Sequence, residues 1–146
     1  QGVSSAASDV YKRQLLSFIV FVGLELITQN DSYAVVNVPT SAPNIKRRGN
    51  DPIAKMVEHA CLLNKTKYRY KTNLIKNYQN RLDQVGLDYK QRKLNLANSF
   101  KVTKVEKRSI ILVDDLITTG VSLSESIKTL EDKGNTVQGC VVIASN

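Results

Sequence analysis

The sequence predicts an α/β fold with a parallel sheet and flanking helices. A continuous apolar run at residues 109–113 and a second apolar segment at residues 137–143 have the composition of buried strands. A segment with helical periodicity, residues 122–133, lies between them, and this order is typical of a parallel βαβ unit. The length of 146 residues suffices for one compact domain and is too short for two full ones.

The first 14 residues, QGVSSAASDVYKRQ, are mostly small and polar and match nothing further along the chain. We expect residues 1–14 to be a non-native linker, such as a translated cloning or sequencing segment. The domain itself then covers residues 15–146, and its natural front part is missing.

Residues 15–27 form the most apolar segment, and two interpretations are open. The segment has 13 residues, contains Glu25, and is too short for a bilayer, which needs about 20. A signal peptide would use Lys12 and Arg13 as its basic flank and residues 32–34 as its cleavage site. We favour a buried helix packed on the sheet, because the basic flank lies in the expected linker.

The first strand is expected at residues 34–38, where a β-branched run ends at Pro39. A helix then begins with Asp51 as N-cap and Pro52 in its first turn. Its apolar residues recur every three or four positions, so Met56 and Cys61 are expected in the core.

The middle of the chain gives weaker signals. Basic and polar or aromatic residues alternate over residues 65–71, which predicts an exposed strand or sheet edge. Residues 72–93 have little periodicity and are expected to form a long loop, with a short helix from Asp88 to about Asn98. Another extended piece is expected to begin at Phe100 and Val102. In the final helix, Ser122-x-x-Glu125 predicts a capping box and Gly134 a C-cap.

The net charge of +8 is concentrated in the middle of the chain. Residues 44–108 contain 17 basic and 5 acidic residues, a balance that favours a polyanionic ligand or a solvated basic face. The two cysteines, Cys61 and Cys140, are widely separated, which favours a reducing compartment and hence the cytoplasm. Without a C-x-x-C motif, a thiolate zinc site within this chain is not expected.

A candidate site follows the strand at 109–113. Ligands of parallel sheets bind at the carboxyl ends of the strands, where this chain places Asp114 and Asp115. We expect a polar loop over 114–121 that opens a helix, whose free N–H groups and positive dipole end suit a phosphate. Gly120 would let the backbone approach the anion, and the acids would accept hydrogen bonds from sugar hydroxyls. The simpler alternative is a solvated turn in which Ser122 only caps the helix.

The string from Ile110 to Ser122, IILVDDLITTGVS, resembles at every position the phosphoribosyl pyrophosphate-binding signature of type I phosphoribosyltransferases. The resemblance implies a type I phosphoribosyltransferase-like fold, glycosyltransferase activity, and phosphoribosyl pyrophosphate bound with magnesium. It implies that the catalytic acids Asp114 and Asp115 contact the ribose hydroxyls. It also implies that the 5-phosphate is wrapped by Thr118, Thr119, Gly120, Val121 and Ser122.

A wider set of residues resembles the ComF-like branch, the competence-associated relatives of these enzymes. The set is Val38-Pro39, the cluster at 47–51, the run at 83–87, Arg92, Asn95 and Phe100. The resemblance implies a role in DNA uptake, with single-stranded DNA or competence-machinery proteins as partners. The cysteine-rich zinc motif and the early strand and helix usual in that branch are missing, in agreement with a truncated front. Thr118 stands where purine-salvage members have an aspartate, which disfavours such a purine substrate.

The basic middle supplies further candidates for a polyanionic donor. Lys46, Arg47 and Arg48 follow the first strand and are expected to bind pyrophosphate. Residues 76–95 resemble the mobile loop that closes over such sites, with Arg81, Gln84, Arg92 and Asn95 as candidates.

Two alternatives remain for the whole chain. Tyr68, Tyr70 and Tyr78 lie among basic residues and could stack on bases, as in a non-catalytic module that binds single-stranded DNA. The chain could also be an inactive fragment.

Overall fold

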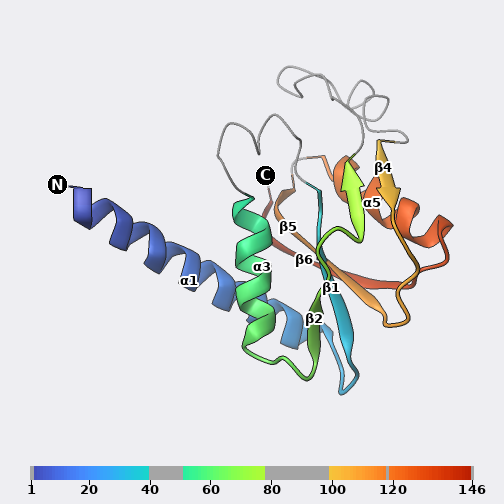
Figure 1. The fold of residues 1–146 in the computed structure, drawn as a ribbon, viewed down its shortest axis with the longest axis horizontal. Helices are drawn as coiled ribbons and strands as arrows, with labels where there is room; N and C mark the ends of the chain where they lie inside the picture. Colours follow the sequence, from blue (N-terminus) through green and yellow to red (C-terminus); the bar gives the residue numbers. More distant parts are fainter. Residues whose placement is uncertain (1, 40–50, 78–98, 118, 146) are drawn as a thin grey trace.

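A computed structural model describes residues 2–39, 51–77, 99–117 and 119–145 (Figure 1). The elements are α1 (Gly2–Ile27), β1 (Tyr33–Asn37), α3 (Pro52–Leu62), β2 (Tyr68–Tyr70), β3 (Ile75–Asn77), β4 (Phe100–Val102), β5 (Ile110–Ile117), α5 (Val121–Asp132) and β6 (Val137–Ser145).

The main sheet has four strands in the order β2-β1-β5-β6, and every neighbouring pair is parallel. A separate antiparallel pair is formed by β3 and β4. The predicted α/β class with a parallel sheet and flanking helices is therefore confirmed. The βαβ unit predicted at the end of the chain is β5-α5-β6.

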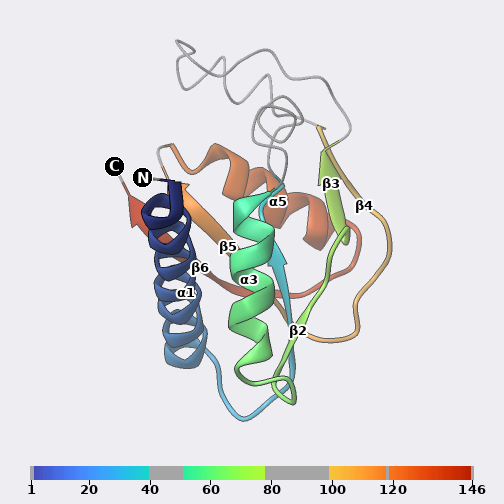
Figure 2. The ribbon, with the colours of Figure 1, turned by 60° about the vertical axis from the view of Figure 1, so that its left-hand side comes forward.

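Two hydrophobic layers cover the two faces of the sheet. In β1, Val35 packs with α1 and α3, whereas Val36 packs with α5, β3 and β4. In β5, Ile111 and Leu112 divide in the same way, because successive strand side chains point to opposite faces. Figure 2 shows α1 and α3 side by side on one face and α5 on the other. Both central strands are buried on both sides, which explains their unbroken apolar runs.

The apolar segment at 15–27 is the second half of α1, whose first half extends away from the body (Figure 1). Val20 and Leu24 are completely buried in the core, as expected for a helix packed on the sheet. The opposite face of the helix is exposed, which the prediction of a buried helix missed. None of the helices in the described ranges is long and apolar enough to cross a membrane.

Close packing joins α1 to β6 at one glycine. A Cβ on Gly23 would lie 2.7 Å from Cγ1 of Val141, so the helix approaches the strand at a distance that only glycine permits. The two segments lie more than a hundred residues apart in the sequence, and no local pattern predicts this contact.

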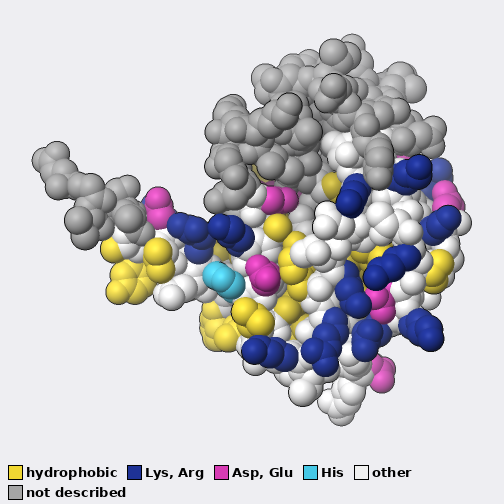
Figure 3. Space-filling model, in the orientation of Figure 1, with side chains coloured by type: hydrophobic (Ala, Val, Ile, Leu, Met, Phe, Trp, Pro, Cys, Tyr) yellow, Lys and Arg dark blue, Asp and Glu magenta, His cyan; other side chains and the backbone are white. Residues whose placement is uncertain are grey.

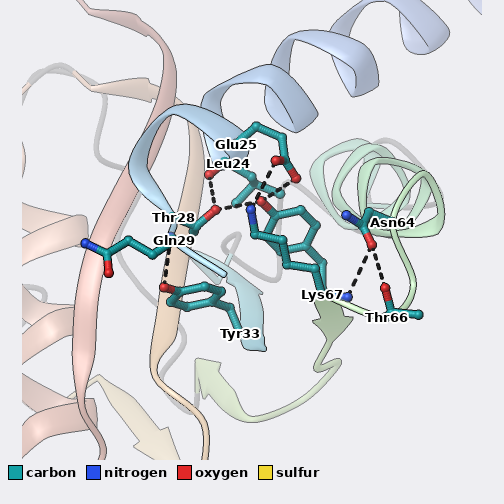
Figure 4. Close-up of polar contacts among 9 residues, drawn as sticks. Leu24, Glu25, Thr28, Gln29, Tyr33, Asn64, Thr66 and Lys67 are labelled. Carbon is teal, nitrogen blue, oxygen red and sulfur yellow. Dashed lines mark hydrogen bonds and ion pairs between the residues drawn. The ribbon is translucent and has the colours of Figure 1, made fainter. Parts of the chain in front are cut away.

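A polar cluster ties the end of α1 to β2 at the amino ends of the strands (Figure 4). The hydroxyl of Tyr68 donates to Glu25 at 2.8 Å, and Lys67 forms an ion pair with the same carboxylate at 3.0 Å. The hydroxyls of Tyr68 and Thr28 lie 2.7 Å apart. The hydrogen bond from Tyr68, more than the ion pair with Lys67, lowers the pKa of Glu25.

Several predicted elements need adjustment. The strand predicted at 109–113 continues to Ile117, so Asp114 and Asp115 belong to β5 and not to a loop. Pairing with β6, which itself runs on to Ser145, holds this extension in the sheet. Residues 75–77, predicted as loop, form β3, whose buried Ile75 packs in the layer under α5. The helix predicted from residue 88 lies outside the described residues.

Two predictions for the helix after residue 51 are confirmed. Asp51 caps α3, accepting bonds from the amides of Ile53 and Ala54 at 3.0 and 3.3 Å. Met56 and Cys61 are buried in the core, and burial raises the pKa of the Cys61 thiol to about 12.

Candidate functional site

The helices that follow β1 and β5 lie on opposite faces of the sheet. The chain after β1 reaches α3, in one hydrophobic layer, whereas the chain after β5 enters α5, in the other. Because β1 and β5 are neighbours whose following helices lie on opposite faces, their carboxyl ends mark the switch point at which open α/β sheets bind ligands in a crevice.

Two carboxylates lie at this crevice. The amide of Val38 donates to the carbonyl of Val113 at 2.9 Å, so Asp114 follows level with the end of β1. Strand geometry sends Asp114 and Asp115 to opposite faces of β5. Asp115 is exposed, whereas Asp114 is only 9% exposed.

The environment of Asp114 changes its acidity. Burial, and then the neighbouring charge of Asp115, raise the pKa of Asp114 to about 6. One hydrogen bond partly opposes this, since the amide of Asp115 donates to Oδ1 of Asp114 at 3.0 Å. Asp114 therefore changes charge close to neutral pH, where an ordinary aspartate is fully ionised.

The segment after β5 opens a helix without a side-chain cap. Gly120 is the N-cap of α5, with φ of 70° and ψ of 0°, a left-handed conformation that favours glycine. The Gly120 carbonyl accepts the first helical bond, from the amide of Ser124 at 2.9 Å, and Gly120 itself has no side chain that could cap the N–H groups of this turn. At α3, by contrast, the carboxylate of Asp51 occupies that position. The start of α5 therefore has features that attract an anion: donor groups, a positive dipole end and a glycine in place of a capping side chain.

The capping box predicted at Ser122 and Glu125 is wrong. The left-handed turn at Gly120 starts the helix two residues earlier, so Ser122 lies inside the first turn, half-buried. The Ser122 carbonyl accepts a bond from the Ser126 hydroxyl at 2.7 Å. The predicted C-terminal glycine is confirmed, because Gly134 has φ of 90° and follows the last turn of α5.

The other predicted site residues divide into two groups. Thr119 is exposed beside Gly120, and Val121 is buried at the start of α5, where it anchors the turn. The second group lies outside the described residues and comprises Thr118, Lys46, Arg47, Arg48, Arg81, Gln84, Arg92 and Asn95.

A cavity of about 420 Å³ lies beside the crevice, and the sequence analysis missed it. It is lined by residues at the carboxyl ends of β1 and β2, the start of α3, and β3. On its wall, the Tyr70 hydroxyl donates to Oδ1 of Asn37 at 2.8 Å, and the Asn37 amide donates to Asp51 at 3.4 Å. Lys71, which is paired with Glu106, and Lys76 also line it. These residues come from four separate elements, so only the tertiary structure brings them together.

The tyrosines near the basic residues do not form a stacking surface. Tyr68 is 1% exposed and belongs to the core, and the Tyr70 hydroxyl is bonded to Asn37. Tyr78 lies outside the described residues. The expected platform of Tyr68 and Tyr70 for bases is therefore wrong, because β2 turns these rings inward.

Basic side chains gather around β2 and the connection from β4 to β5 (Figure 3). Part of this charge is neutralised within the chain. Glu106 pairs with Lys71 at 3.0 Å and with Arg108 at 3.3 Å, and Lys67 is held by Glu25. Lys65 and Arg69 remain exposed.

Comparisons with known proteins give a similarity of fold. No protein-family model matches the chain, and no curated protein matches it. Among the solved structures that match are two crystal forms of a hypoxanthine phosphoribosyltransferase from Staphylococcus aureus, tetragonal and orthorhombic. Their TM-scores are 0.43 and 0.44, with sequence identities of 10% and 9%. Each alignment covers 90% of this chain and 62% of the solved chain, so this chain spans less than two thirds of their length.

Proposed function

We propose that the crevice between β1 and β5 binds phosphoribosyl pyrophosphate, and that the chain is a phosphoribosyltransferase-type domain of the ComF-like branch. The observation that carries the proposal is the amino end of α5, where the left-handed Gly120 stands in place of a capping side chain and closely follows the acids at the end of β5. One short segment thus offers hydrogen-bond acceptors for a sugar, followed by an anion site. The signature that the segment from Ile110 to Ser122 resembles has the same order.

The 5-phosphate would bind the N–H groups of the first turn of α5, with the Thr119 hydroxyl as a further donor. Asp114 and Asp115 would accept hydrogen bonds from the ribose hydroxyls. In the transfer step the bond from C1 to the pyrophosphate oxygen breaks, and its electron pair leaves with pyrophosphate. An acceptor nitrogen then forms the new bond to C1 and releases its proton to water. The nearby carboxylates stabilise the positive charge that develops on the ribose ring.

The donor set at the crevice fits magnesium carried by the substrate. Mg²⁺ prefers carboxylates together with substrate phosphates, and the exposed carboxylate of Asp115 would lie at the same edge of the sheet as the bound donor. When bound, the ion would neutralise charge on the leaving pyrophosphate. Lys46, Arg47 and Arg48 are proposed as further pyrophosphate ligands, and Arg81, Gln84, Arg92 and Asn95 as residues of a closing loop.

Calorimetric titration of phosphoribosyl pyrophosphate with magnesium tests the binding. We expect Asp115→Asn to weaken binding about tenfold or more, because a hydrogen bond to a charged group contributes about 1.5–3 kcal/mol. Asp115 is exposed, so this change should leave the fold intact. Asp132→Asn, an equally conservative change at the far end of α5, should leave the affinity unchanged. Absence of heat with the unmodified chain, or equal affinities for the two variants, would contradict the proposal.

A further inference from the structure

Helix α1 has an exposed apolar face opposite its buried one. Val20 and Leu24 are completely buried, whereas Leu15, Phe18, Ile19, Val22 and Leu26 are between 40% and 80% exposed. At about 100° per residue, these five side chains form one continuous stripe that points away from the sheet. We call Leu15, Phe18, Ile19, Val22 and Leu26 the α1 stripe.

The α1 stripe has a symmetric spacing except at Leu26, whose counterpart in a symmetric pair would be the exposed Tyr11. Around a point between Phe18 and Ile19, Leu15 and Val22 lie at equal distances in opposite directions along the helix. A two-fold axis through this point would bring a second α1 against the first in antiparallel orientation. Leu15 would then face Val22 of the second copy, and side chains of matching size and polarity would meet. Self-complementarity of this kind is the requirement for an isologous interface.

We infer that the α1 stripe is a dimer interface, in which α1 packs antiparallel against α1 of a second copy of this chain. The inference does not depend on the proposed function, because α1 contributes nothing to the crevice at the carboxyl edge.

The size and charge of the stripe support this occupant. With side-chain areas on the order of 150–250 Å² and the exposures above, the five residues present about 500 Å² per copy. Both copies together would bury about 1,000 Å², the lower end of what specific interfaces require. Residues 15–24 carry no charge, and Glu25 is held by Lys67 and Tyr68, so no like charges oppose the pairing.

Cysteine cross-linking tests the geometry directly. In the antiparallel pair the two copies of residue 18 lie about 1.5 Å apart along the axis, close enough for a disulfide. The two copies of residue 26 lie about 22 Å apart. In a Cys140→Ser background, which removes the exposed natural thiol, Phe18→Cys should form a covalent dimer under mild oxidation. Leu26→Cys, on the same stripe, should not.

Sedimentation of the unmodified 146-residue chain should give twice the monomer mass. Ile19→Glu should return it to the monomer, because two glutamates would meet at the two-fold axis. Val105→Glu, a matched change at an exposed apolar residue of the β4–β5 connection, should leave the dimer intact. A monomeric unmodified chain, or equal cross-linking of the two cysteine variants, would overturn the inference. Binding of lipid vesicles by a monomeric chain would overturn it in favour of a membrane surface.

Discussion

Asp114 combines a place inside the sheet with a carboxylate that the candidate site needs ionised. Its pKa in the folded chain is about 6, against 3.8 for an ordinary aspartate. Between these values the folded chain holds a proton that the unfolded chain has lost. The contribution of Asp114 therefore lowers the free energy of unfolding as pH rises from about 4 to about 6.

Replacing Asp114 with asparagine should stabilise the chain above pH 6. The amide keeps an acceptor for the Asp115 N–H but carries no charge, so we expect a gain of about 2–3 kcal/mol at neutral pH and little change near pH 4. Urea unfolding of both proteins across this range measures the difference.

The free energy of unfolding must be compared between the two proteins at each pH, because Glu25 and Glu106 have lowered pKa values and lose their stabilisation as pH falls. A difference that does not change with pH would contradict the assignment. If the Asp114→Asn variant also fails to bind phosphoribosyl pyrophosphate, the loss would add evidence that the Asp114 carboxylate serves the proposed function.

Local chemistry made some site residues predictable and hid others. Asp114 and Gly120 could be found because a carboxylate after an apolar strand and a glycine before a helix are local signals. The capping residue was misassigned because serine is a common N-cap, and only the backbone reveals that Gly120 turns left-handed first. The burial of Asp114 could not be predicted, since it depends on β5 continuing beside β6.

At the scale of elements, strands buried on both faces were the most predictable parts. Residues 34–36 of β1 and 110–113 of β5 are apolar at every position because both hydrophobic layers contact them. Short strands were harder. In β3, only Ile75 is buried, so its three residues carry too little pattern to separate a strand from a loop.

The contact between α1 and β6 gives a prediction for helix packing. Gly23→Val should lower the free energy of unfolding by about 1–3 kcal/mol, because the added methyl groups meet Val141 in a closely packed layer. Leu26→Val places the same side chain at an exposed position of α1 and measures the cost of a β-branched residue alone. Val141→Ala is then added to each variant, and thermal unfolding is measured. The added change should restore part of the stability lost by Gly23→Val, and none of that lost by Leu26→Val. Equal losses in the two single variants would show that the close approach does not matter.

At the scale of the whole molecule, two deletions test whether the domain begins after residue 14. Residues 7–15 are exposed on α1, whereas Val20 and Leu24 complete the core under α3. Deleting residues 1–14 should therefore leave the melting temperature nearly unchanged. Deleting residues 1–24 removes two completely buried side chains and should cost more than about 3 kcal/mol. Differential scanning calorimetry distinguishes the two cases, and a large loss from the shorter deletion would show that residues 1–14 belong to the domain.

The two outer strands of the sheet differ in how well they resist unwanted pairing. Strand β2 is bordered by Lys67 and Lys71 and carries Arg69 on its exposed side, and positive side chains discourage a second strand from adding there. Strand β6 has no charged residue along its nine positions. Among the described strands, β6 is therefore the side from which fibrous aggregation would start, and the chain's high net charge does little to protect it.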